Sequence, residues 1–159
     1  DCNIYYFEEP NTPVFYNNKY VKDNVKMPLA HGERVFGRWE YIRYFMDNSI
    51  QVIQPDIGNA GGITETKRIC DMAYTFDVGV QIHTCASHLL TPPSVQLEAC
   101  IPNFVIHEQH MRSMNPSNQE LTAKVVMPKN GYLDVTDDIG IGNEWSDKAL
   151  ASEDQITLN

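Results

Sequence analysis

The 159-residue chain has few positive charges, no closely spaced cysteine pair and no long apolar run. Lysine and arginine supply 12 residues against 21 of aspartate and glutamate, and the formal net charge of −9 argues against nucleic acid and anionic membranes as partners. No apolar run approaches the roughly 18 residues that span a bilayer, and no signal peptide is visible. The four cysteines lie far apart without a CxxC pair, which favours a reduced, cytoplasmic protein.

The sequence also lacks an initiator methionine, and its first residues run almost directly into an apolar, strand-like segment. We therefore expect that it begins inside a longer chain. The composition, 42% hydrophobic and 21% charged, is typical of a globular domain and not of a disordered segment.

Five short segments rich in β-branched and aromatic residues are predicted to be buried strands. Each ends in a side chain able to do acid–base or metal-binding chemistry, and these end residues lie 25, 23, 27 and 25 positions apart. Proline within two of the segments weakens the pattern locally, because proline cannot donate to a ladder. The predicted strands, with their end residues, are 4–8 (Glu8), 27–33 (Glu33), 52–56 (Asp56), 78–83 (His83) and 104–108 (Glu108).

Helix-like stretches separate the predicted strands. Apolar residues recur at helical spacing in 38–46 and 64–76, a third helix is expected over 93–100, and the Asn-rich stretch 15–26 is a poorer candidate. On 38–46 the predicted buried face consists of Trp39, Ile42, Phe45 and Met46.

Local signals refine two of these helices. Gly61 and Gly62 permit a tight entry into 64–76, and Thr64 is the expected N-cap. Cys70 and Cys100 fall on apolar helix faces and are predicted to be core residues.

Alternating strands and helices predict an α/β fold with a parallel sheet, either an open doubly wound sheet or part of a (β/α)8 barrel. A doubly wound fold usually carries a Gly-rich phosphate loop after its first strand, where Glu8-Glu9-Pro10 stands instead. Chemistry-bearing residues at successive strand ends favour the barrel, whose active sites gather there. We predict a partial barrel of about five strands over 1–110 and a C-terminal segment over 111–159, with a hairpin at 129–131 and a short helix at 145–150.

Glu8 and Glu33 end neighbouring predicted strands, so their carboxylates should converge at one edge of the sheet. Hard oxygen ligands of this kind suit Mg²⁺. Alternatively, both glutamates are salt-bridged or solvated at loop starts. Glu9 is expected to be a solvated or ion-paired neighbour.

Asp56 and His83 end the next two strands, and Glu108 ends the last one. A carboxylate that accepts from one imidazole nitrogen fixes the tautomer and leaves the other nitrogen to move a proton. The alternative is a histidine that is merely hydrogen-bonded at a strand end. Glu108 is expected to act as a hydrogen-bonding or electrostatic group.

The remaining histidines offer a rival interpretation. His83, Cys85 and His88 could form a zinc site or a thiol nucleophile, although their spacing is not specific. His107 and His110 flank Glu108 and are expected either to support the site residues or to lie on the surface. His31 could point toward the site or away from it.

Several of these motifs, taken in order over about 105 residues, form a specific set. They are Phe7-Glu8-Glu9-Pro10, Gly32-Glu33, Gln54-Pro55-Asp56, Gly61-Gly62-Ile63-Thr64, His83 and Ile106-His107-Glu108. The set resembles the C-terminal barrel half of the enolase superfamily, in its mandelate racemase subgroup and among its sugar-acid dehydratases of the galactonate dehydratase type.

The resemblance implies a (β/α)7β barrel in which this chain supplies strands four to eight. Glu8 and Glu33 would be the second and third Mg²⁺ ligands, and Asp56 and His83 the family's Asp–His dyad, with His83 moving the proton. Glu108 would lie near the metal-bound carboxylate of the substrate. Sites of this superfamily use a Lys or His base with Mg²⁺ to stabilise an ene-diolate.

The implied activity is Mg²⁺-dependent dehydration of a small-molecule sugar (aldonic) acid to a 2-keto-3-deoxy acid, by a lyase that forms a homo-oligomer. Two alternatives remain, a racemase or epimerase of an α-hydroxy acid and a catalytically inactive half-barrel fragment. The family's first metal ligand, its leaving-group acid and its capping domain are expected upstream of residue 1, and residues 111–159 would pack on that capping domain. The stretch 84–88 also departs from the Pro-Leu-Gly type that often follows the family's histidine.

Overall fold

The computed structural model describes residues 2–85 and 87–152, so the last seven residues of the predicted C-terminal segment lie outside the described residues. The chain divides into two compact units. The first comprises residues 2–83 and 97–108, and the second comprises the described parts of 84–96 and 109–159. Within the described residues, no helix is both long and apolar enough to cross a membrane.

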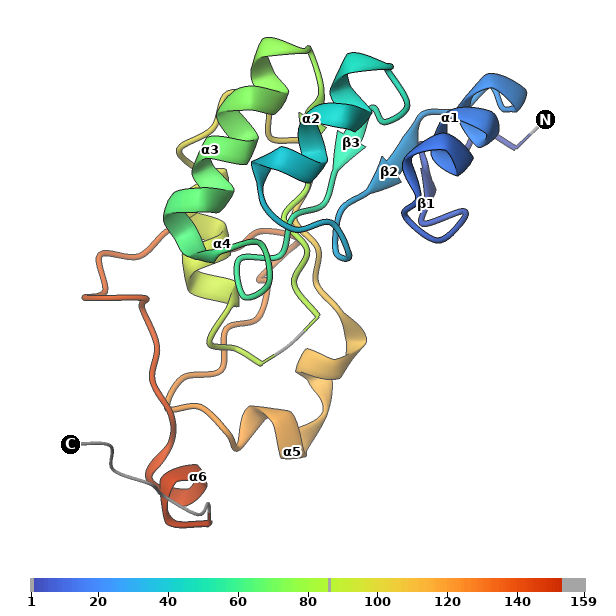
Figure 1. The fold of residues 1–159 in the computed structure, drawn as a ribbon. Coiled ribbons are helices and arrows are strands. Elements are labelled where there is room, and N and C mark those ends of the chain that lie inside the picture. Colours follow the sequence, from blue (N-terminus) through green and yellow to red (C-terminus); the bar gives the residue numbers. More distant parts are fainter. Residues whose placement is uncertain (1, 86, 153–159) are drawn as a thin grey trace. The chain divides into compact units, whose positions relative to one another are not determined.

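The first unit contains a parallel sheet whose strands occur at four of the five predicted places (Figure 1). The strands are β1 (Phe7–Glu8), β2 (Leu29–His31), β3 (Val52–Ile53) and β4 (Gly79–Val80). The fifth predicted segment pairs through one isolated bridge, between Val80 and Phe104. The regular strands are shorter than the sequence pattern suggests, and Pro28 and Pro55 lie just outside β2 and β3.

Helices occupy the crossovers between the strands. They are α1 (Phe15–Asn24), α2 (Arg38–Met46), α3 (Gly62–Thr75) and α4 (Thr91–Glu98), and the bounds of α2 agree with the prediction. The positive φ angles of Gly61 and Gly62, 109° and 82°, provide the tight entry into α3. Thr64 was expected to cap this helix but lies inside its first turn, because the helix already begins at Gly62.

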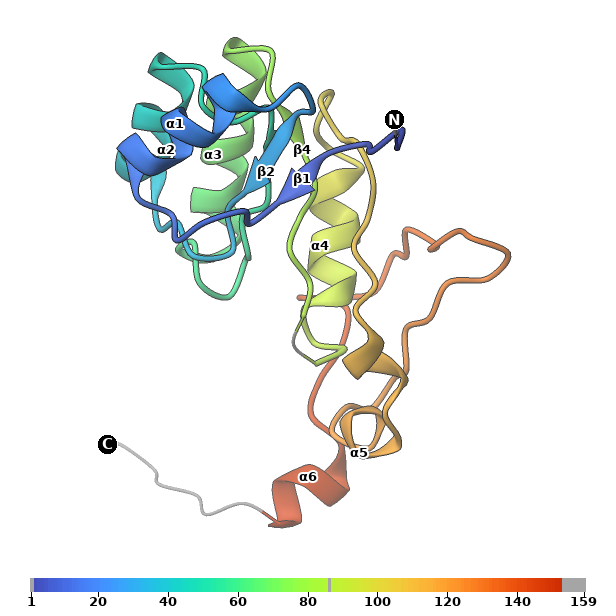
Figure 2. The ribbon, with the colours of Figure 1, turned by 90° about the vertical axis from the view of Figure 1, so that its right-hand side faces the viewer.

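The strand order β1-β2-β3-β4 follows the chain, and each crossover steps to the next neighbour in the same direction. Right-handed crossovers that advance in one direction place all their helices on the same face of the sheet. Figure 2 shows α1, α2 and α3 on one side of the strands. This arrangement is that of a (β/α) barrel, since a doubly wound sheet reverses direction and carries helices on both faces.

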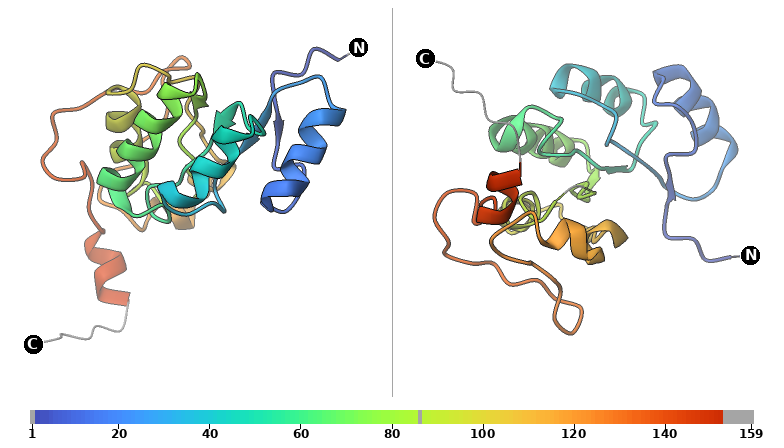
Figure 3. Two further views of the ribbon diagram at one scale, coloured as in Figure 1. Left: turned by 45° about the horizontal axis from the view of Figure 1, so that its top comes forward. Right: turned by 90° about the horizontal axis from the view of Figure 1, so that it is seen from below.

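The core of the first unit lies between these helices and the strands, where α2 and α3 run side by side (Figure 3). The predicted buried face of α2 is wrong in part, because Trp39 and Met46 are 78% and 75% exposed. Phe45 is buried as predicted, and Tyr41 and Tyr44 are buried in place of Trp39 and Met46. The tyrosines can be buried because their hydroxyls find partners, Tyr41 donating to the Gly32 carbonyl (2.8 Å) and Tyr44 to the Pro13 carbonyl (2.9 Å).

The two cysteines that were predicted to be core residues differ. Cys70 on α3 is fully buried, as expected, whereas Cys100 is exposed. Cys100 lies beyond the end of α4 at Glu98, so the helical pattern that placed it in the core does not extend that far.

The second unit is mostly irregular, with a 3-10 turn (Met111–Met114), α5 (Pro116–Gln119) and α6 (Asp147–Ser152). The predicted hairpin at 129–131 is confirmed by reciprocal backbone hydrogen bonds between Lys129 and Tyr132, at 2.7 and 3.0 Å. Asn130 and Gly131 both have positive φ, as a tight hairpin turn requires.

Two isoleucines on α3 offer a matched test of the core. Ile69 is fully buried and Ile63 is 45% exposed, so the same substitution changes the same helix in two environments. We expect Ile69→Ala to lower the free energy of unfolding by about 2–5 kcal/mol, and Ile63→Ala by about 0.5 kcal/mol. Urea unfolding of the whole protein measures both, and equal losses would contradict this packing.

Candidate active site

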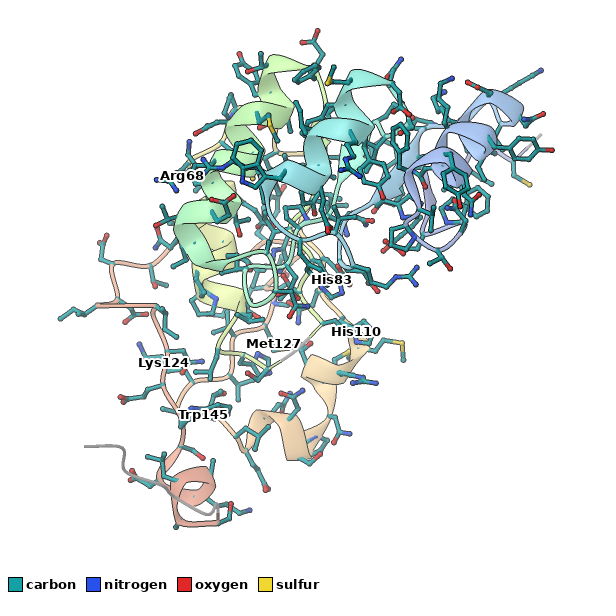
Figure 4. The ribbon with its side chains drawn as sticks, viewed as in Figure 1. Arg68, His83, His110, Lys124, Met127 and Trp145 are labelled. Atoms are coloured by element: carbon teal, nitrogen blue, oxygen red, sulfur yellow. The ribbon has the colours of Figure 1, made fainter. Side chains whose placement is uncertain are left out.

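The predicted chemistry-bearing residues of the first unit gather at the carboxyl end of the parallel strands. Glu8 is the last residue of β1, and Glu33 follows β2 by two positions. Asp56 and His83 form an isolated parallel bridge just beyond β3 and β4. Parallel strands end at one edge of a sheet, so these residues meet there; Figure 4 labels His83 in this region.

The His83 ring is held by Asp56. Nδ1 of His83 lies 2.7 Å from Oδ2 of Asp56, and the other carboxylate oxygen accepts from the backbone N–H of Gly58 at 2.7 Å. Both side chains are nearly buried. A carboxylate at Nδ1 favours the tautomer with the proton on that nitrogen, and it leaves Nε2 as the nitrogen able to exchange a proton.

Nε2 of His83 lies 3.0 Å from Oε2 of Glu33, so the ring stands between two carboxylates. Burial lowers the pKa of His83, but the Asp56 hydrogen bond and the charges of Glu108, Asp56 and Glu33 outweigh burial and raise it above its ordinary value. The imidazole is therefore a stronger base than a free histidine, as proton abstraction requires.

Negative charge also accumulates around Glu8. Partial burial and the charges of Glu108, Glu33 and Glu9 raise the pKa of Glu8, while the Gln54 side chain opposes part of the increase. Carboxylates that repel one another in this way form a suitable place for a cation, and oxygen donors suit a hard one such as Mg²⁺.

Glu8 and Glu33 fit the role of Mg²⁺ ligands by their chemistry. Magnesium sites commonly use one or two protein carboxylates and complete the coordination with water or substrate. Within the described part of the chain, no group of three or more His, Cys, Asp or Glu side chains is arranged to hold a metal ion. Two carboxylates alone would be only part of a ligand set for Mg²⁺.

Two polar side chains that the sequence did not single out, Tyr6 and Gln81, are linked to Glu108 by hydrogen bonds. The Tyr6 hydroxyl donates to the Gln81 side-chain oxygen, and the Gln81 amide donates to Oε2 of Glu108 at 3.5 Å. Burial and the nearby charges of Glu8 and Glu108 raise the pKa of Tyr6, which keeps its hydroxyl protonated as a donor.

A sequence signal for these missed residues exists. Side chains two positions apart on a strand share a face. A polar residue stands two positions before four of the five candidate site residues, and these pairs are Tyr6 and Glu8, His31 and Glu33, Gln54 and Asp56, and Gln81 and His83. The alternation thus indicates a polar layer beneath the strand-end residues.

Glu9 connects the loops that carry Glu8 and Glu33. Its carboxylate lies 3.0 Å from Nδ1 of the buried His31, accepts from Nε of Arg34 at 2.9 Å, and accepts from the backbone N–H of Gly32 at 3.3 Å. Burial raises the pKa of Glu9, but these partners outweigh it and lower the pKa to about 2. The expectation of an ion-paired Glu9 is confirmed, and His31 points toward it.

The rival zinc interpretation gains no support, because the other histidines have different partners. In the second unit, Nε2 of the buried His88 donates to the Ser113 carbonyl at 2.9 Å, and its Nδ1 faces the backbone N–H of Val126 at 3.4 Å. Nδ1 of His110 accepts from the Arg112 N–H at 3.1 Å. Both ring nitrogens of His88 are thus engaged and unsuited to a metal.

The model of the family described as enolase C-terminal domain-like matches residues 1–149. A curated D-galactonate dehydratase from Pectobacterium atrosepticum is 31% identical over 113 residues, covering 65% of this chain and 30% of the relative. A D-xylonate dehydratase from Haloferax volcanii is 27% identical over 143 residues, covering 89% of this chain and 34% of the relative. The chain therefore spans about a third of the length of these curated relatives.

Solved structures agree with the family match. A member of the enolase superfamily from Salmonella Typhimurium superposes with a TM-score of 0.94 at 42% identity, over 98% of this chain and 40% of that one. A putative dehydratase from Zymomonas mobilis gives 0.92 at 40% identity, over 96% and 39%. A putative galactarate dehydratase from Agrobacterium radiobacter, bound to Na and L-malate, gives 0.84 at 29% identity, over 97% and 42%.

The Glu9 contacts predict a pH-dependent stabilisation. The pKa is about 2 in the folded chain against an ordinary 4.5, so the stabilisation is complete above pH 4.5 and is lost as the pH falls toward 2. At pH 7 we expect Glu9→Gln to lower the free energy of unfolding by about 1.5–3 kcal/mol.

Unfolding in urea at pH 7 and pH 2 tests this expectation, since the difference between wild type and Glu9→Gln should shrink at the lower pH. Asp23→Asn is the control, because it removes an exposed ion pair with Lys19 on α1 and should cost about 0.5 kcal/mol. A Glu9→Gln effect of the same size at both pH values would contradict the ion-pair account.

Proposed function

The chain belongs to the enolase C-terminal domain-like family, and from this premise we propose that the whole protein is a Mg²⁺-dependent lyase that removes water from a sugar acid. The observation that carries the proposal is the His83 imidazole, fixed by Asp56 at Nδ1, with Nε2 facing the Glu33 carboxylate. The proposal concerns the whole protein, because the chain spans about a third of its curated relatives.

Glu8 and Glu33 would hold the metal. Mg²⁺ bound there would neutralise the substrate carboxylate and stabilise the charge that develops beside it as the α-proton leaves. The converging negative charges around Glu8 support this assignment, because, together with partial burial, they raise the pKa of that carboxyl.

His83 would take the proton from C2 of the substrate at Nε2, giving the ene-diolate. Asp56 stabilises the imidazolium that results and keeps the ring in place. The 3-hydroxyl then leaves as the C2–C3 double bond forms, and a general acid elsewhere in the whole protein donates the proton that makes it water. Tautomerisation of the resulting enol gives a 2-keto-3-deoxy acid.

Glu108 would contribute near the substrate carboxylate as a hydrogen-bonding or electrostatic group. Its position relative to Tyr6 and Gln81 supports this role, because the amide that donates to Glu108 is itself fixed by the tyrosine hydroxyl.

The relatives guide the choice of substrate. Two are dehydratases of galactonate and xylonate, and the structure with L-malate bound carries another hydroxy acid. We therefore propose an aldonic or related sugar acid as substrate, and a homo-oligomer in the cytoplasm as the working form.

Product analysis tests this function. The whole protein is incubated with Mg²⁺ and a panel of sugar acids that includes galactonate and xylonate. We expect it to form a 2-keto acid, and we expect EDTA to abolish this reaction. His83→Asn should lose both keto-acid formation and deuterium exchange at C2 in D₂O, because it removes the proton-accepting nitrogen.

His110→Asn is the matched control, because the His110 ring has its own partner in the Arg112 backbone N–H, and the variant should leave both rates unchanged. Deuterium exchange that persists in His83→Asn would show that another group is the base. An acid of unchanged mass with inverted C2 would instead indicate a racemase or epimerase.

A further inference from the structure

Glu98, the last residue of α4, is a buried carboxylate outside the group of strand-end residues described above. Its side chain is 5% exposed, and Oε2 lies 2.8 Å from Nδ1 of His107, whose side chain is 14% exposed. Nε2 of His107 is buried and has no hydrogen-bond partner within the described residues, so the ring is held through Nδ1.

The backbone N–H of Ile82 is also close enough to this carboxylate to lower its pKa. The location of this N–H explains the contact. Val80 and the fifth segment form a short parallel ladder, in which the Val80 N–H donates to Asn103 (2.8 Å) and the Val105 N–H donates to Val80 (2.9 Å). The bridge at Val80 is isolated, and the next backbone N–H on this edge of the strand is that of Ile82. Because the regular ladder has ended there, this N–H faces Glu98 in place of a strand carbonyl.

Glu98 therefore contacts the residue immediately before His83 and the residue immediately before Glu108. Its two partners lie on the two neighbouring segments whose ends carry these candidate site residues. A single carboxylate thus fixes the spacing of the two segment ends just below the site.

We propose that Glu98 and His107 are positioning residues, which act through the Ile82 backbone and the His107 ring to orient His83 and Glu108. The proposal rests on the proposed function only for its kinetic consequence, because the effect on His83 is structural and can be observed without turnover. Neither residue is assigned contact with the substrate.

The energetics support a positioning role over a purely stabilising one. Burial raises the pKa of Glu98, and the contacts with His107 and Ile82 offset this cost only in part. Buried polar pairs commonly add little net stability compared with apolar residues of similar volume. The pair therefore contributes mainly directional contacts to the two segments.

Glu98→Met tests the proposal, because methionine keeps most of the volume and removes both contacts. In the whole protein with Mg²⁺, we expect kcat to fall about 10–100-fold, the size usual for a lost supporting contact, while KM and the dissociation constant for Mg²⁺ change little. Glu98→Gln should recover part of kcat, since its amide oxygen still accepts a hydrogen bond.

Glu65→Met is the matched control. Glu65 is also a partly buried carboxylate on a helix, α3, and its ion pairs with Arg38 and Arg68 do not involve the site residues. We expect this variant to keep kcat, even if its stability falls as much as that of Glu98→Met.

A second readout is independent of turnover. The His83 Nδ1 proton, hydrogen-bonded to Asp56, should give a low-field proton resonance that His83→Asn removes. This resonance should shift or broaden in Glu98→Met and in His107→Asn, and should be unchanged in Glu65→Met. If wild type shows no dehydratase activity, the proposed function fails while this readout still decides the role of Glu98.

An unchanged His83 resonance in folded Glu98→Met would overturn the proposal. An unchanged kcat in an active enzyme would do the same. Should Glu98→Met fail to fold, Glu98→Gln and His107→Asn provide the same two measurements with smaller changes of structure.

Discussion

Repulsion between like charges at one edge of a parallel sheet is the constraint on which this structure depends. Parallel strands end together, so Glu8, Glu33, Asp56 and Glu108 lie close enough for their charges to act on the same neighbours. Burial and these charges together raise the pKa of Glu8, and the Asp56 hydrogen bond and these charges together raise the pKa of His83. An arrangement of this kind costs stability, and it becomes favourable when a cation and a protonated imidazole share the negative charge.

The chain holds these groups in place through contacts made one or two residues away from them. Glu9, next to Glu8, joins its loop to that of Glu33 through Gly32, His31 and Arg34. Tyr6 and Gln81 lie two positions before Glu8 and His83, and they form the polar chain that ends at Glu108. These contacts fix the backbone next to the strand-end side chains.

How far the sequence predicts this structure depends on the range of the interactions involved. The regular intervals between strand ends predicted the parallel sheet and the convergence of Asp56 and His83, because both follow from local periodicity. The buried face of α2 was predicted wrongly in part, since it depends on where the tyrosine hydroxyls find distant carbonyls. Likewise, the Tyr6–Gln81 contact joins residues 75 positions apart, which no local pattern reveals.

The central claim is that Glu8 and Glu33 bind a divalent cation near His83, and that His83 itself is not a ligand of the cation. Anomalous diffraction from crystals of the whole protein soaked in Mn²⁺, a stand-in for Mg²⁺ with similar ligand preferences, tests it most directly. We predict a strong peak about 2.0–2.2 Å from carboxylate oxygens of both glutamates, with the His83 ring outside the coordination sphere. A peak ligated by His83, or no peak between Glu8 and Glu33, would contradict the account.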